Sequence, residues 1–73
     1  MMLKNCRPLT LKEQDKLKSL MFFKKITQRY IAEKNLISVT NINHIVNGLK
    51  KITPSRIKMF NRVGIKLEEI MEN

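Results

Sequence analysis

The chain has 73 residues and a formal net charge of +9, from 15 Lys and Arg against six Asp and Glu. This length allows one domain around a small core, and the excess of cations predicts a polyanionic partner such as nucleic acid. The single cysteine, Cys6, excludes an internal disulfide, and no Cys/His cluster has zinc spacing.

Two further absences bear on where the protein works. No apolar run is long enough to cross a bilayer, and the first nine residues lack the apolar core of a signal peptide. With one cysteine and no disulfide, the chain is suited to a reducing compartment. We therefore expect a cytoplasmic protein that binds no membrane.

The first nine residues have no clear period and contain Pro8, so we expect them to form an arm that leads into the first helix. Thr10 followed by Glu13 is a capping-box pattern, in which the hydroxyl and the carboxylate each accept a hydrogen bond from a backbone N–H. The helix should bury an apolar stripe made of Leu17, Leu20, Met21 and either Phe23 or Ile26.

Two short helices should follow, over residues 28–34 and 39–46 or 39–47, with Thr27 and Ser38 as their N-cap residues. Ala32 is small enough for the two helices to approach closely. Ile42 and Ile45 are three residues apart and turn one side of the later helix toward the core. Gly48 fits the left-handed position that commonly follows a helix.

A fourth helix should begin at Thr53-Pro54, because Thr caps well and Pro is preferred at the first helical position. Ile57, Phe60 and Val63 are its expected buried face, and Gly64 should end it. A last short helix is expected over residues 67–71. Since no strand-like alternation is present, the sequence predicts an all-α, compact five-helix domain over residues 10–73.

The side of the third helix away from the core should be polar, because it carries short amides and hydroxyls and no acid. Its members are Thr40, Asn41, Asn43, His44 and Asn47. Between Lys34 and Leu67 the chain holds no Asp or Glu. A polar helix of this kind, in a positive surrounding, is suited to base edges in a major groove.

The pattern resembles the Cro/repressor-type helix-turn-helix family of phage and bacterial transcriptional regulators. The residues that carry this resemblance, over about residues 12–71, are Thr27-Gln28, Ile31-Ala32, Ile37-Ser38, Ile42, Ile45, Asn47-Gly48, Thr53-Pro54, Gly64-Ile65 and Leu67. It implies a lambda-repressor-like fold with the helix-turn-helix at residues 27–48.

Three positions depart from the family pattern. Leu36 stands where the turn usually has Gly, Val46 where Glu is common, and Lys24-Lys25 where Gly often precedes the second helix. Because Asn adopts the left-handed conformation more easily than Leu, we expect Asn35 to take part of the bend.

The resemblance implies that the third helix enters the major groove while the second crosses the phosphate backbone. Gln28, Asn47, Lys50 and Lys51 would then contact phosphates, and Val39, Thr40 and Asn43 or His44 would face bases. Ser38 caps its helix in either case, and Asn41 and Asn43 have the alternative of being solvated polar positions. The expected DNA-binding residues are Gln28, Ser38, Val39, Thr40, Asn41, Asn43, His44, Asn47, Lys50 and Lys51. With no Arg among them, A·T-rich half-sites are favoured.

The sequence thus favours a small phage- or prophage-type repressor that binds a palindromic operator on double-stranded DNA as a homodimer. Its two recognition helices would lie about 34 Å apart. The dimer contact is expected at the end of the fourth helix and on the last helix, with Leu67, Ile70 and Met71 as candidates, although these residues could instead close the monomer core.

The alternative is a helix-turn-helix protein that acts as a protein-binding antirepressor or inhibitor; an antitoxin-like regulator is a third possibility. We expect no enzyme, catalytic residue, metal, cofactor or small-molecule substrate, because no catalytic set and no phosphate-binding Gly-rich loop is present.

Overall fold

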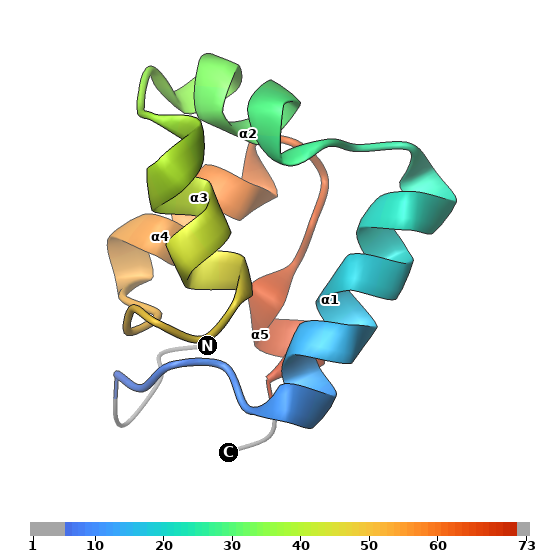
Figure 1. Cartoon of the computed structure of the whole chain (residues 1–73), viewed down its shortest axis with the longest axis vertical. Coiled ribbons are helices and arrows are strands. Elements are labelled where there is room, and N and C mark those ends of the chain that lie inside the picture. Colours follow the sequence, from blue (N-terminus) through green and yellow to red (C-terminus); the bar gives the residue numbers. More distant parts are fainter. Residues whose placement is uncertain (1–5, 72–73) are drawn as a thin grey trace.

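The computed structural model describes residues 6–71, so the first five residues of the expected arm and the last two residues of the chain lie outside it. Within this range the chain forms five helices and no strand, which confirms the all-α prediction. The helices are α1 (Leu11–Lys24), α2 (Gln28–Asn35), α3 (Val39–Val46), α4 (Pro54–Asn61) and α5 (Leu67–Ile70). Figure 1 shows α1 along one side of the molecule, α3 and α4 along the other, and α5 between them.

The helices begin where the predicted caps lie. The Thr10 hydroxyl accepts from the Glu13 N–H at 3.2 Å, and the Glu13 carboxylate accepts from the Thr10 N–H at 2.9 Å, which completes the capping box. At α2, α3 and α4, the side-chain oxygens of Thr27, Ser38 and Thr53 each accept one hydrogen bond from a backbone N–H of the first turn. Each cap satisfies a backbone N–H that has no partner inside its helix.

Four helices end in one backbone motif, in which a left-handed residue is followed by a residue whose N–H reaches back to the last turn. After α2, the Ile37 N–H donates to the Ala32 carbonyl at 3.0 Å, and the left-handed residue is Leu36, with φ 56°. The equivalent left-handed residues after α1, α3 and α4 are Lys25, Gly48 and Gly64.

The expectation that Asn35 takes part of the bend is wrong. Asn35 is the last residue of α2, and its side-chain amide donates to the carbonyls of Ile31 and Met59 at 2.9 and 3.1 Å. Because Ile37 packs against the core at the position after the bend, the left-handed conformation falls on Leu36. Asn35 instead ties α2 to α4.

The core contains apolar side chains from all five helices. On α1 it buries Leu17 and Met21, with Leu20 and Ile26 packed at its edge. The alternative that Phe23 joins this stripe is wrong, because Phe23 is 83% exposed at the helix end. Ile57 and Phe60 are buried as predicted, and Val63 is partly buried.

The last helix closes the monomer. Leu67, Ile70 and Met71 are all buried, with at most 8% of each residue exposed. They pack in the cluster that α1 and α4 also form. These three residues therefore have almost no exposed surface with which to contact a second copy. Their burial agrees with the alternative that they close the core of the monomer.

The end of the expected arm belongs to the domain. Leu9 is buried in the core, and the Arg7 carbonyl accepts from the Ile52 N–H at 2.9 Å. The Arg7 guanidinium binds both carboxylate oxygens of Glu13, at 2.6 and 2.7 Å, and Glu13 is only 1% exposed. A buried carboxylate needs such a partner, so this pair fixes the chain entering α1. None of the helices in residues 6–71 has both the length and the apolar content to span a membrane.

Candidate nucleic-acid interface

The site is built on the close packing of α2 against α3, the most extensive contact between helices in the molecule. Ile31 and Ala32 of α2 and Ile42 and Ile45 of α3 are all buried at their junction. The small Ala32 side chain lets the two backbones approach, and the turn at Leu36 directs α3 away from α2 (Figure 1). The core therefore holds α3 rigidly by one side.

The opposite side of α3 is polar. Thr40, Asn43, His44 and Asn47 have the spacing i, i+3, i+4 and i+7, which places them on one face of a helix. Thr40 and Asn43 are exposed, while His44 and Asn47 are half-buried. We call these four residues the outer face of α3. It presents hydroxyl, amide and imidazole groups to solvent and no acid.

The first residue of α2 contacts this face. The Asn43 side-chain amide donates to the Gln28 Oε1 at 3.3 Å. The Asn47 amide in turn donates to the Asn43 carbonyl at 2.9 Å. Gln28 and Asn43, which the sequence assigned to phosphate and base contacts, are therefore brought together at one place on the surface.

The remaining predicted residues of α3 lie at the edge of this face. The Ser38 hydroxyl accepts from the Asn41 N–H at 3.2 Å, so Ser38 caps the helix as predicted. Val39 is 43% exposed beside it. Asn41 is half-buried on the side toward α4, and its side-chain oxygen accepts from the Lys50 ammonium. Asn41 thus holds a lysine next to the outer face of α3.

The loop between α3 and α4 contributes both predicted lysines. Lys50 is half-buried against Asn41, whereas Lys51 is exposed. The Arg56 guanidinium donates to the Lys51 carbonyl at 2.8 Å, which fixes the backbone of this loop. The cations therefore stand on one flank of α3, at the side of α4.

A further cation beside the outer face of α3 comes from α1, and the sequence did not predict it. Lys18 of α1 donates from its ammonium to the Asn47 Oδ1 at 2.9 Å. The two residues are 29 positions apart in the sequence, and a contact between such distant positions cannot be predicted from local sequence patterns. Lys18 accordingly stands at the C-terminal end of the outer face of α3, whereas Lys50 stands beside Asn41 at its edge.

The chemistry of this surface is that of polar recognition. Among residues 6–71, no three His, Cys, Asp or Glu side chains gather where they could hold a metal ion. Amide, hydroxyl and ammonium groups on a convex helix match base edges and phosphates.

Comparison with protein-family models, curated proteins and solved structures returned no match for this chain.

Proposed function

We propose that the protein is a sequence-specific DNA-binding transcriptional regulator of the lambda-repressor-like helix-turn-helix type, with α3 as its recognition helix. One observation carries the proposal: the acid-free outer face of α3, with Thr40 and Asn43 exposed, has two lysine ammonium groups beside it, Lys18 at Asn47 and Lys50 at Asn41. Base edges need short hydrogen-bonding side chains, and the phosphates on either side of a groove need cations.

Thr40 and Asn43 are the residues that would read bases. Thr40 offers a methyl group to a thymine and a hydroxyl to a neighbouring edge. The Asn43 amide has two N–H donors and one acceptor oxygen, and one donor goes to Gln28. The second donor and the oxygen fit N7 and the N6 amine of adenine, so A·T-rich half-sites are the proposed target.

The second helix and the loop would hold the DNA backbone. Gln28 lies at the N-terminus of α2, where backbone N–H groups favour a phosphate. Lys50 and Lys51 would contact phosphates on the α4 side of the groove, and Lys18 on the α1 side. These contacts add affinity for any sequence and set the orientation of α3.

In biological terms, we propose a phage- or prophage-type repressor that acts in the cytoplasm or nucleoid and binds a palindromic operator as a homodimer. The role requires no metal, cofactor, membrane or catalytic step. Two outer faces would meet successive turns of the duplex, about 34 Å apart.

A second candidate function is a protein-binding antirepressor or inhibitor, and one observation favours it. Phe22 and Phe23 are 87% and 83% exposed at the end of α1. Adjacent exposed aromatic residues are common at protein interfaces.

A salt titration of binding to random and selected duplexes separates the two candidates. A regulator loses affinity steeply with salt yet keeps a sequence preference of about 10³-fold or more. A protein-binding module gives weak affinity with the same value for every duplex, and that result would refute the proposed function.

A further inference from the structure

The outward side of α1 carries apolar residues that the core does not use. Leu11 at its start is 79% exposed and Phe22 near its end is 87% exposed. Between them on the same side lie Asp15 and Lys18, both exposed. The four residues have the spacing i, i+4, i+7 and i+11, which places them in one row along a helix. We call this row the α1 stripe.

The stripe has a symmetry that is visible in its numbering. Leu11 and Phe22 share a midpoint between residues 16 and 17, and Asp15 and Lys18 share the same midpoint. A second α1, turned antiparallel about that point, would set Leu11 against the partner's Phe22 and Asp15 against the partner's Lys18. Each contact would then occur twice, which is what a two-fold interface requires.

We propose that the α1 stripe is the surface on which a second copy of this chain docks, with the two α1 helices antiparallel. This surface would supply the dimer contact of the regulator. The inference rests on the proposed function only in the statement that the dimer binds a palindromic operator. Residues Leu67, Ile70 and Met71, by contrast, are buried inside the monomer.

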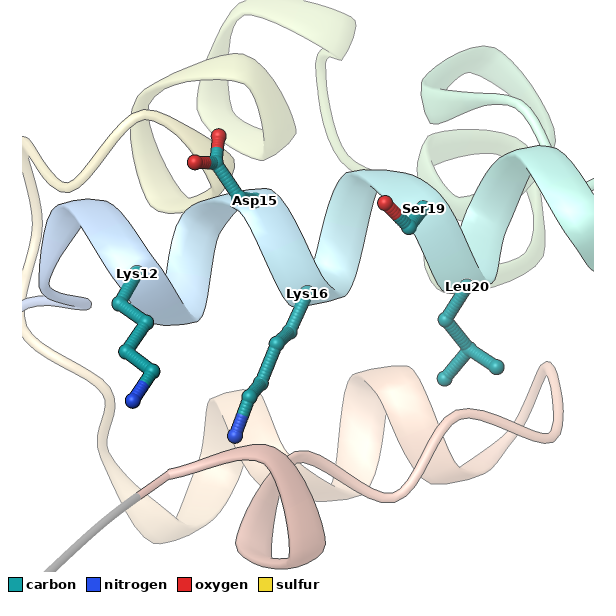
Figure 2. Close-up of a pocket in the computed structure, with 5 residues that line it drawn as sticks. All are labelled: Lys12, Asp15, Lys16, Ser19 and Leu20. Carbon is teal, nitrogen blue, oxygen red and sulfur yellow. The ribbon is translucent and has the colours of Figure 1, made fainter.

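The charged residues of the α1 stripe itself are complementary to those of a second copy. Asp15 makes no ion pair within residues 6–71, and Figure 2 shows its carboxylate pointing away from the side of α1 that Lys12 and Lys16 occupy. An acidic partner would meet this carboxylate with like charge. A second copy instead offers it the ammonium of Lys18.

The position of Lys18 links this surface to the DNA-binding one. Its ammonium has three N–H donors, and one is given to Asn47 at the end of the outer face of α3. A neighbouring copy paired through Lys18 would thus adjoin the surface proposed to bind DNA. The 14-residue α1 is about 21 Å long, and a single helix pair of that length forms a weak dimer that operator DNA would strengthen.

Two adjacent phenylalanines provide the first test. Phe22 lies in the stripe, whereas Phe23, equally exposed, is turned about 100° away around the helix. Sedimentation equilibrium of the full chain without DNA, from micromolar to millimolar protein, should show a monomer–dimer equilibrium. Phe22→Ser should weaken dimerisation at least about tenfold and Phe23→Ser by much less. A wild-type chain that stays monomeric throughout, or equal effects of the two variants, would overturn the proposal.

Charge reversal provides the second test. Asp15→Lys brings two lysines to each pairing position, and Lys18→Asp brings two aspartates, so each variant alone should weaken the dimer about tenfold. The double variant restores opposite charges and has the net charge of the wild type, so its dimerisation should return to within about threefold. Failure of the double variant to recover would exclude the antiparallel pairing. Because dimerisation is measured without DNA, its outcome does not depend on the salt titration. The dimer proposal and the proposed function can therefore fail separately.

Discussion

Asn43 on α3 donates a hydrogen bond to Gln28 on α2 at 3.3 Å. The residue that we propose contacts a base is thus hydrogen-bonded to one that we propose contacts a phosphate. The bond joins the two helices at their exposed edge. It limits the rotation of the Asn43 amide before any DNA arrives, which lowers the ordering cost of a base contact. This arrangement has consequences for specificity that substitutions can measure.

Asn43→Ala should relax sequence preference at one base pair by about 1–3 kcal/mol, because it removes a bidentate contact. Gln28→Ala should weaken binding to all duplexes and, by freeing the amide, also lower that same preference. Because the two side chains are in contact, the double variant should lose less than the two single losses combined. The check is a double-mutant cycle on the selected duplex and on single-base variants of it. Strictly additive losses would show that the hydrogen bond has no part in recognition.

Substitution of the lysines around α3 should change the affinity for all DNA sequences, whereas substitution of Asn43 should change the base preference. Lys18→Ala, Lys50→Ala and Lys51→Ala should each weaken binding to every sequence and reduce the salt slope by about one unit. The exposed Lys66, the N-cap residue of α5, serves as a matched control, since α5 makes no contact with α3 and Lys66→Ala removes one positive charge there. A change in base preference with any of the three lysine variants would mean that the roles assigned to helix and loop are wrong.

Leu36 should be a site of stored backbone strain. It has φ 56° while its side chain is 93% exposed, so it has the penalty of a left-handed residue and gains little packing. Leu36→Gly should raise the free energy of unfolding by about 0.5–1 kcal/mol, because strain relief exceeds the added entropy of the unfolded chain. Leu36→Ala keeps the Cβ and should leave stability nearly unchanged. Denaturant unfolding compares the two, and equal stabilities for Gly and Ala would refute the strain argument.

Gly48 and Gly64 should respond differently to the same substitution. Both have positive φ, 73° and 84°, but a Cβ at Gly48 would overlap the Gln14 amide and lie 2.8 Å from the Leu9 carbonyl, whereas a Cβ at Gly64 would meet nothing. Gly64→Ala should cost about 1 kcal/mol from backbone strain. Gly48→Ala should cost about 3 kcal/mol because the clash adds to the strain. Thermal unfolding of both variants tests this ranking, which equal losses would contradict.

Local signals in the sequence located the helices well, since a cap acts over three or four residues. Thr10, Thr27, Ser38 and Thr53 all cap the helices that they were predicted to start. The prediction for the bend relied on the local preference of Asn for the left-handed conformation and therefore named Asn35. The bend lies at Leu36 because the next residue, Ile37, packs against the core, and this packing outweighs the local preference.

Contacts between distant segments were not predictable from spacing. Periodicity marked Leu67, Ile70 and Met71 as apolar without showing that α1 and α4 cover them. It likewise gave no sign that Lys18 would reach Asn47 across the fold. The polar residues of α3 were found because the spacing within one helix is local information, but their neighbours came only with the tertiary structure.

The central claim is that the outer face of α3 reads DNA sequence, and selection of binding sites from a random duplex pool tests it most directly. Wild-type protein should enrich one palindromic, A·T-rich motif whose half-sites are one duplex turn apart, and the Thr40→Ala and Asn43→Ala variants should lose preference within each half-site. A pool that stays random after selection, or a motif left intact by both variants, would contradict the claim.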